Sequence, residues 1–379
     1  MRMINMVARG EVMRKLLIFT IAILWVSGEA FAAKTKTILN YPTPYSGTRA
    51  LGMGNAFAAV GRDPDGAFYN PATLYEMDFN IGLIEAQVEV NQNSIDLIQD
   101  VMDLTQNSTG QDSTDAAMNL VETNMGKLIH ARVTDYSRLA WKSFVIGAFG
   151  GVNVDTRLHY PLSSSGIMEA RAITMAGGVV GGSRAIEAVE GLRLGMSVKQ
   201  IATFTLQHSF KLADVMDQPN PDDLMYQGQT LVFDIGGLYN ITQGKLGGWN
   251  SQAGLSFMNI GGIQYTEEDT IPMTVNLGLS MRPETFLGET IFAVDIHDLF
   301  FAYPQDSSLW KRVHMGMEFG VLGRHLLFRA GLSQGFPTAG FALDLWIFKV
   351  GYAYSAEEMG AYAGQAKDSR HTIHLSAGW

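Results

Sequence analysis

Apolar and polar residues alternate along most of the chain after Tyr136. The clearest stretch is 191–210, where mostly apolar residues fall on even positions from Leu192 to Phe210 and mostly polar or small ones on the odd positions between them. A period of two predicts a β-strand with two chemically different faces. This strand is about twice as long as those of soluble proteins. Its length fits a barrel whose wall continues past the membrane surface.

The same pattern predicts about fourteen strands, an even number as in single-chain bacterial barrels. We expect them near 78–91, 136–141, 143–160, 165–181, 191–210, 228–241, 250–260, 272–282, 287–299, 309–321, 325–334, 338–345, 347–356 and 370–379. Long connections follow odd-numbered strands, whereas tight turns at 141–143, 283–284 and 322–323 follow even-numbered ones. The sequence therefore predicts an all-β fold, a transmembrane antiparallel barrel with long extracellular loops and short periplasmic turns.

The first long connection, 92–135, carries apolar residues at helical spacings, divided by a polar break at 106–114. We expect an extracellular loop with one or two short helices. At the other end of the chain, Ile373, Leu375, Ala377 and Trp379 alternate with polar or small residues. A last strand that ends in an aromatic residue resembles the signal read by the outer-membrane assembly machinery, which we expect as a partner.

The N-terminus has the pattern of a cleaved signal peptide within residues 1–32. Arg14 and Lys15 precede the apolar run 16–26, and Ala30-Phe31-Ala32 forms a small-x-small cleavage site. Translation would start at Met13 and the mature chain at Ala33. The apolar run is shorter than the roughly 18 to 20 residues of a spanning helix, so cleavage is favoured over an anchor. Together with the strands, this predicts the outer membrane of a Gram-negative bacterium.

Composition narrows the function classes. The net charge is −10, which argues against a nucleic-acid partner. Charged residues make up 17%, below the roughly 25% of soluble domains. The chain has no cysteine, which excludes a thiol nucleophile, a disulfide and a thiolate zinc site. We expect neither a cofactor nor a metal.

Residues 33–77, between the signal peptide and the barrel at 78–379, do not alternate. The part from Tyr45 to Leu74 is rich in glycine and proline, yet it carries apolar side chains such as Met53, Phe57 and Phe68. An irregular segment with this much apolar surface has to bury it. We predict a plug inside the barrel, at its periplasmic end.

With the plug and the strands in hand, the chain resembles the FadL-like outer-membrane superfamily. Residues 47–57 (GTRALGMGNAF) and 67–72 (AFYNPA) are similar to its N-terminal hatch. Late stretches at 331–340 and 354–360 are closer to its PorV-like branch, and loop 92–135 departs from the known binding loops. The resemblance implies a hatch that gates a lumen. Its gate residues would be Gly52, Gly54, Asn70, Pro71 and Ala72.

The strand pattern also assigns charged residues to the lumen: Glu85, Glu89, Arg193, Lys199, Asp295, His297, Arg312, Glu318, Arg329 and Lys349. Mixed charge on a polar lumen is most often structural pairing, and the alternative is a ligand path.

Catalysis and metal binding are disfavoured. Asp295 with His297, and His374 with Ser376, share strand faces, but neither pair has an evident third orienting group. His371 and His374, three apart, face opposite sides of a strand. We therefore expect a protein that is not an enzyme.

Two functions remain open. The first is passive transport of hydrophobic small molecules, such as long-chain fatty acids, through a hatch-gated lumen. The second is a PorV-like, non-transporting barrel that serves as a secretion shuttle or a scaffold for protein partners. Apolar residues lining the lumen beside the hatch would favour transport, whereas a wholly charged lumen around a fixed plug would favour the scaffold.

Overall fold

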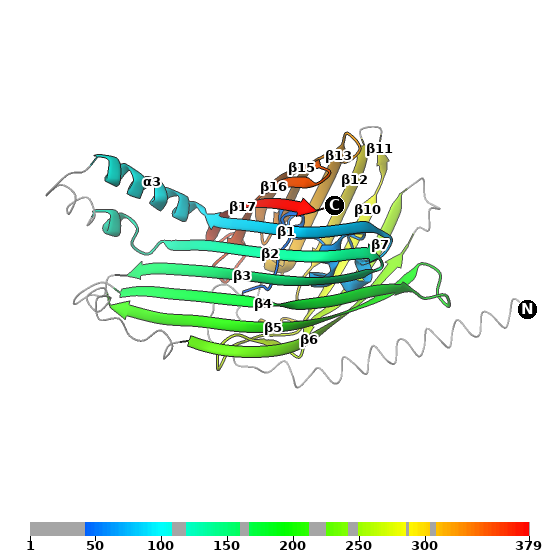
Figure 1. The fold of residues 1–379 in the computed structure, drawn as a ribbon, viewed down its shortest axis with the longest axis horizontal. Coiled ribbons are helices and arrows are strands. Elements are labelled where there is room, and N and C mark those ends of the chain that lie inside the picture. The colour runs from blue at the N-terminus through cyan, green and yellow to red at the C-terminus, as the bar shows by residue number, and fades with distance from the viewer. Residues whose placement is uncertain are drawn as a thin grey trace, which may run out of the picture.

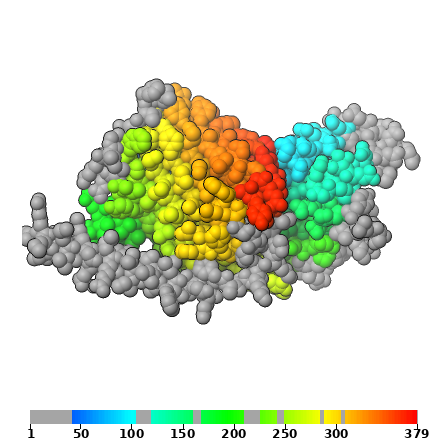
Figure 2. Space-filling model, turned by 180° about the vertical axis from the view of Figure 1, so that it is seen from behind, coloured from blue at the N-terminus to red at the C-terminus, as the bar shows by residue number. Residues whose placement is uncertain are grey.

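A computed structural model describes residues 42–107, 119–159, 167–211, 225–241, 249–285, 288–303 and 308–378. The predicted signal peptide and Trp379 lie outside these residues. Figure 1 shows a barrel with β1 to β6 on the near side, and Figure 2 shows the opposite face, formed by later strands.

Fourteen antiparallel strands form the wall within the described residues: β1 (Met77–Asn91), β2 (Leu128–Lys142), β3 (Phe144–His159), β4 (Ile167–Ala185), β5 (Leu192–Lys211), β6 (Met225–Asn240), β7 (Asn250–Ile260), β10 (Thr274–Arg282), β12 (Gly288–Ile296), β13 (Val313–Val321), β14 (Leu326–Ser333), β15 (Phe336–Leu345), β16 (Phe348–Glu358) and β17 (Lys367–Gly378). Pairing of β1 with β17 and of β10 with β12 closes the ring. The predicted fold class is confirmed.

Alternation places apolar side chains on the outer face, as in Leu231 (54% exposed) and Ile373 (52%). Large aromatic side chains such as Trp141 and Phe348 are exposed beside the tight turns. An apolar outer band flanked by aromatic residues is the arrangement of a transmembrane barrel. The chain is therefore a barrel of the outer-membrane type.

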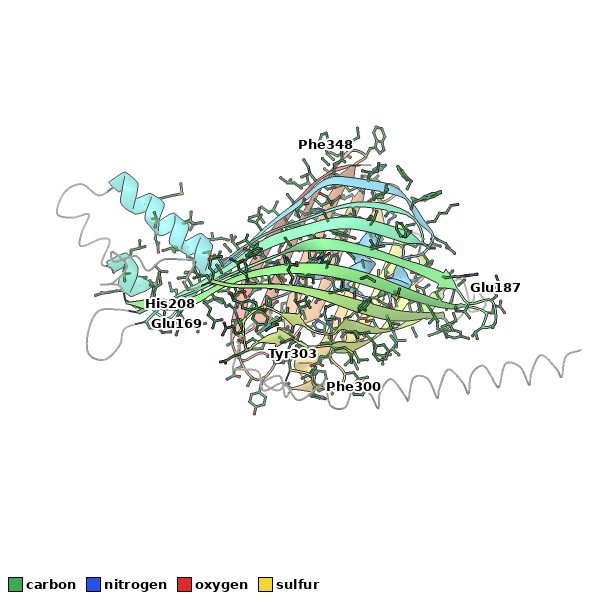
Figure 3. All side chains as sticks on the ribbon, turned by 60° about the horizontal axis from the view of Figure 1, so that its bottom comes forward. Glu169, Glu187, His208, Phe300, Tyr303 and Phe348 are labelled. Atoms are coloured by element: carbon green, nitrogen blue, oxygen red, sulfur yellow. The ribbon has the colours of Figure 1, made fainter. Side chains whose placement is uncertain are left out.

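The two ends of the barrel differ in the length of their connections. Turns at 142–143, 322–325 and 346–347 are tight, and the helix α3 (Gln92–Asn107) projects from the opposite end (Figure 1). Glu187 lies at the tight-turn end and Glu169 at the end that carries α3 (Figure 3). Among the described residues, no helix has the length and apolarity that would let it cross a bilayer.

The predicted loop 92–135 is too long. Helix occupies α3 and residues 119–123, but β2 begins at Leu128 rather than near 136. In this extension His130, Arg132 and Thr134 point inward and Val133 outward. The spacing of Met125 and Leu128 matched a helix, so the start of the strand was not recognised. A strand at the rim of a barrel no longer needs a continuous apolar outer face, and its two-residue pattern is therefore weaker.

Two smaller features complete the fold. Residues Leu309–Arg312, predicted to begin a strand, form the 3-10 turn η5 instead. In the connection between β7 and β10, β8 (Ile263–Gln264) and β9 (Thr270–Ile271) form a hairpin whose apolar residues are buried against the inner wall. The two-residue strand β11 (Glu284–Thr285) pairs with the start of β12.

Candidate functional site

Residues 42–76 pack inside the barrel and are here called the plug. Its short elements are α2 (Thr48–Gly52), η1 (Pro64–Phe68) and η2 (Pro71–Thr73). They contact strands around the wall, α2 against β14 to β17 and η2 against β4 to β6. Because no stretch is long enough to form a stable helix alone, this segment depends on the wall for its shape.

The Asn-Pro-Ala motif folds one of these turns. The Asn70 side chain accepts from the Ala72 backbone N–H (3.0 Å), and Pro71 occupies the first position of η2, where no N–H is needed. The Asn70 amide donates to Ala58 O within the plug (2.7 Å) and to Gly237 O on β6 (3.2 Å). The motif therefore joins two parts of the plug to the wall.

Sequence reasoning missed a set of wall glycines that face the plug. At each of these positions a Cβ atom would overlap the plug: Gly195, Gly236, Gly254, Gly316 and Gly331, on β5, β6, β7, β13 and β14. Gly54, a predicted gate residue, has a φ of +65° and lies against backbone of β13 and β14. Gly52 lies against Gly340. Glycine in these strands allows backbone-to-backbone approach, and the inward glycines within the predicted strands were the available signal.

Side chains of the wall also bind the plug backbone. The hydroxyls of Ser256 and Ser280 donate to the carbonyls of Tyr69 (2.9 Å) and Ala59 (2.8 Å). Asp295, buried on β12, accepts from the N–H groups of Phe57 (2.6 Å) and Ala58 (2.7 Å). Serines in alternating strands gave no distinctive signal in the sequence.

An ion cluster ties α2 to β13 and β14. The Arg49 guanidinium donates to both carboxylate oxygens of Glu318 (2.8 and 2.7 Å) and to Asp63 (2.6 Å). Glu318 also accepts from Arg329 (2.8 Å) and Arg324 (2.9 Å). Such fork-shaped, charge-assisted contacts hold a geometry as well as a charge.

The plug contains one carboxyl with a raised pKa. Although burial opposes it, the charge of Arg49 lowers the pKa of Asp63. Burial and the neighbouring Asp63 carboxylate raise the pKa of Asp65 to about 7. The proton therefore goes to Asp65, because Asp63 has the guanidinium partner.

The ten predicted lumen residues fall into five groups. Lys199 pairs with Asp234 (2.6 Å) and Arg312 with Asp298, both buried. Arg193 and Lys349 reach Glu76 (3.0 Å) and Asp344 (3.0 Å) near the tight-turn end. Glu318 and Asp295 accept hydrogen bonds from the plug, and Arg329 lies beside Gly52 of the plug and donates to Glu318. His297 stacks on His314, whose ring meets Gly54 O. Glu85 binds His374 of β17, and Glu89 binds His130 of β2.

The residue pairs weighed for catalysis do not form an orienting chain. Asp295 binds plug N–H groups and lies 3.4 Å from His297. His374 and Ser376 both contact Glu85 (2.9 and 2.8 Å). Within the described strands no hydrogen bond links that serine to that histidine.

One side of the lumen is apolar. Phe149, Ile173, Met175, Ile201 and Val232, from β3 to β6, face inward and are almost completely buried. They form one cluster with the β8–β9 hairpin and with the plug. The Phe68 ring packs edge-on against Phe149, with 5.2 Å between centroids. The sequence pattern assigned charged residues to the lumen and did not show this apolar sector.

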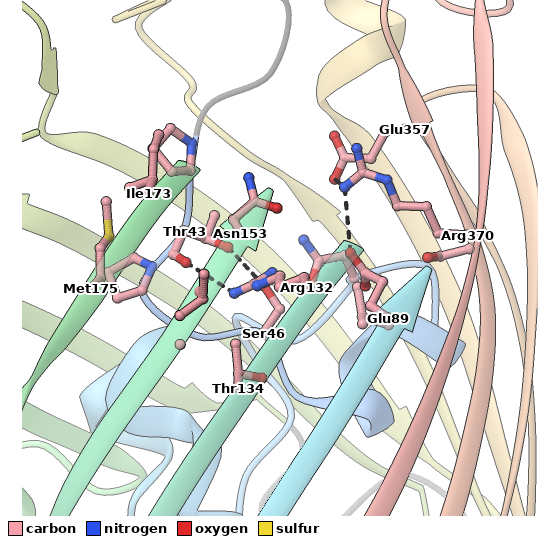
Figure 4. Close-up of a pocket in the computed structure, with 17 residues that line it drawn as sticks. Thr43, Ser46, Glu89, Arg132, Thr134, Asn153, Ile173, Met175, Glu357 and Arg370 are labelled. Atoms are coloured by element: carbon pink, nitrogen blue, oxygen red, sulfur yellow. Dashed lines mark hydrogen bonds and ion pairs between the residues drawn. The ribbon is translucent and has the colours of Figure 1, made fainter. Parts of the chain in front are cut away.

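Figure 4 shows a cavity between the plug and the inner wall. Its volume is about 80 Å³, with Ile173 and Met175 on one side and Glu89 and Arg370 on the other. The Arg132 guanidinium also lines it and donates to Thr43 O (2.9 Å). The cavity thus joins the apolar sector to a charged one.

The charged sector ends in a buried network near the rim. The His130 ring lies 2.7 Å from Asp155 and 3.0 Å from Glu89. Arg171 donates to Asp155 and Arg370 lies 3.5 Å from Glu89. These residues neutralise one another, and they hold β1, β2, β3, β4 and β17 together.

Comparisons with known proteins give structural neighbours only. No family model and no curated protein sequence matches the chain. Solved structures similar to it include the toluene transporter TodX of Pseudomonas putida, at 11% identity over 90% of this chain and 99% of that one, with a TM-score of 0.47. Others are the toluene transporter TbuX of Ralstonia pickettii (11%, 89% and 99%, TM-score 0.46) and the monoaromatic hydrocarbon channel CymD (11%, 89% and 98%, TM-score 0.44).

Proposed function

We propose that this barrel carries hydrophobic or amphiphilic small molecules, such as long-chain fatty acids, passively across the outer membrane. The observation that carries the proposal is the apolar sector of the lumen, which runs from the β8–β9 hairpin to Phe68 of the plug. A fixed apolar wall inside a membrane barrel offers a dry surface to a solute that polar loops would exclude. The proposal includes export through a cleaved signal peptide and insertion through the C-terminal strand.

The cavity beside the plug supports an acid as ligand. The side chains of Ile173 and Met175 suit a hydrocarbon chain. Arg132 forms no ion pair with a carboxylate among the described residues, so its guanidinium suits a ligand carboxylate. Passage would then require the plug to shift near Asn70-Pro71-Ala72.

Uptake in liposomes tests the proposal. Purified barrel should admit a fluorescent long-chain fatty acid, and I173T and M175Q should lower its rate. The outward-facing V154T on β3, outside the cavity, is the matched control and should leave uptake unchanged. R132Q should impair the acid more than a neutral hydrocarbon probe. Deleting residues 46–74 should change permeability; equal rates for all proteins and probes would refute transport.

A second candidate is the protein-binding scaffold. It is favoured by the polar contacts that fix the plug to β12, β13 and β14, including those of Asp295 and Glu318. Affinity purification from native membranes separates the two functions. A stoichiometric protein partner supports the scaffold, and bound lipid or fatty acid supports transport.

A further inference from the structure

A second cavity lies between the plug and the inner wall, beside the tight turns at 322–325 and 346–347, and is here called the Arg138 cavity. Its volume is about 460 Å³. It is lined by the plug, by β1 and β2, and by β14 to β17. The cavity of Figure 4, which contains Arg132, is here called the Arg132 cavity. Within the described part of the chain, the two cavities share no lining residue.

One strand reaches both cavities. Four inward-facing side chains follow one another along β2: Arg132, Thr134, Tyr136 and Arg138. The two arginines are six residues apart, which is about 20 Å along a strand. Thr134 lines the Arg132 cavity, and only Tyr136 stands between it and Arg138. The inner face of β2 therefore leads directly from one guanidinium to the other.

Aromatic rings close this path. The Tyr136 ring packs against Tyr45 and Phe68 of the plug, with 5.1 and 5.0 Å between centroids. Tyr45 and Phe68 also pack against each other (5.1 Å), and Phe68 packs against Phe149 of β3 (5.2 Å). These contacts are apolar, so an acyl chain can replace them with contacts of its own. The four rings are here called the ring cluster.

The packed plug leaves polar atoms unpaired beside this cluster. Among the described residues, Nε of Arg138, Oη of Tyr136 and Oδ1 of Asp65 have no hydrogen-bond partner and are closed off from solvent. Tyr136 is fully buried and Asp65 is 6% exposed. Such atoms are uncommon in folded proteins, because the unfolded chain pairs them with water. A molecule that enters here with polar atoms of its own would pair them.

Arg138 has the geometry to bind an anion. One of its terminal nitrogens donates to Tyr136 O (3.2 Å) and lies 3.4 Å from Glu85. Glu85 is itself held by His374 (2.9 Å) and Ser376 (2.8 Å). The Nε–H of Arg138 therefore remains for a ligand carboxylate, a group that arginine binds with charge-assisted hydrogen bonds.

Asp65 lines the same cavity and does not exclude an anion. Burial and the Asp63 carboxylate raise the pKa of Asp65 to about 7, although the charge of Arg138 acts against them. In its neutral form the Asp65 carboxyl donates a hydrogen bond to a carboxylate. Asp63 already has a partner in Arg49 (2.6 Å). The cavity thus offers a ligand carboxylate two donors.

We propose that Arg138 and Asp65 form a second head-group site, which takes the carboxylate of a long-chain acid after it leaves Arg132 and passes the ring cluster. This inference rests on the transport function proposed above and adds the site by which an acid leaves the plug toward the tight-turn end. A neutral hydrocarbon gains nothing from either group. The site therefore favours acids over other hydrophobic solutes.

Paired uptake assays in liposomes test the site. R138Q should lower uptake of a fluorescent long-chain fatty acid about tenfold and change uptake of its methyl ester less than about twofold, since only the acid loses a charge-assisted hydrogen bond. R138K keeps the charge and should recover part of the acid rate. R184Q is the matched control and should resemble the wild type. Arg184 is exposed on the outer face of β4 and lines neither cavity.

The outcomes separate the site from the transport function. Heat-modifiable migration on gels would verify that each variant is folded. A wild type that admits neither probe would refute transport, and the site with it. A wild type that admits both, with an unchanged acid rate in R138Q or equal losses of acid and ester, would refute the second site alone.

Thiol protection measures binding at the site directly, because the native chain has no cysteine. Lys349 lines the Arg138 cavity with a side chain that is 39% exposed, so K349C should react with a water-soluble thiol reagent. Saturating fatty acid should slow this reaction about fivefold, and its methyl ester should not. The acid should give no protection in K349C/R138Q. Equal labelling of K349C with and without the acid would overturn the proposal.

Discussion

Replacing Arg49 with methionine should loosen the plug while the barrel stays folded. Arg49 makes three charge-assisted hydrogen bonds, two to Glu318 and one to Asp63. Its side chain is 15% exposed and that of Glu318 is fully buried. Removing one partner of a buried pair costs about 3–5 kcal/mol. Because Glu318 keeps Arg329 and Arg324, we expect the lower end, about 3 kcal/mol.

The assay is the labelling rate of a cysteine in the plug. Ala67 is fully buried, so A67C reacts with a maleimide only when the plug opens locally. A loss of about 3 kcal/mol corresponds to labelling more than about 100-fold faster. Heat-modifiable migration would verify that the barrel itself remains folded.

The matched control is R62M, on the same plug. Arg62 pairs with Glu76 at 2.8 Å, but these side chains are 51% and 56% exposed. An exposed pair contributes up to about 1 kcal/mol, so labelling should change less than about fivefold. If R49M accelerated labelling no more than R62M does, the ion cluster would not be what holds α2 in place.

Three further predictions use the same labelling assay. G236A should speed labelling or prevent the plug from seating, since its Cβ would overlap Asn70, whereas G237A, whose Cβ faces open space 3.8 Å from Leu194, should not; equal effects would refute close packing. N70A should lower the free energy that holds the plug packed by about 2–3 kcal/mol, since it removes the oxygen that accepts from the Ala72 N–H and leaves buried carbonyls unpaired. A labelling rate within threefold of the wild type contradicts this role. Since the pKa of Asp65 is raised to about 7 from 3.8, the packed plug should lose stability as pH rises from about 4 to about 7, because the released carboxyl ionises first. Labelling, corrected for thiol ionisation, should accelerate over that range, and D65N should remove the acceleration; the same pH dependence in D65N would refute the assignment.

Strand periodicity was enough to predict the barrel, because a two-residue period is a local property of the sequence. It failed at 128–135, where the wall rises above the bilayer and its outer face no longer has to be apolar. It also could not show that Glu85 joins His374 and Ser376. Those contacts depend on pairing between the first and last strands. The wall glycines acquire meaning only once the plug lies against them.

The distribution of contacts around the plug indicates where it would move first. Hydrogen bonds fix it to β12 and β13, through Asp295 and Glu318. Toward β2 and β3 the plug makes mainly ring contacts, with Phe68 against Tyr136 and Phe149, beside one hydrogen bond from Arg132 to Thr43 O. An apolar ligand can replace ring contacts with its own, but it cannot replace buried hydrogen bonds. We therefore expect a hydrocarbon ligand to speed labelling of A67C and to leave that of A58C unchanged, since both buried positions keep the Phe68 ring and the N–H donors to Asp295. Equal acceleration at these sites would mean that the plug leaves as one body.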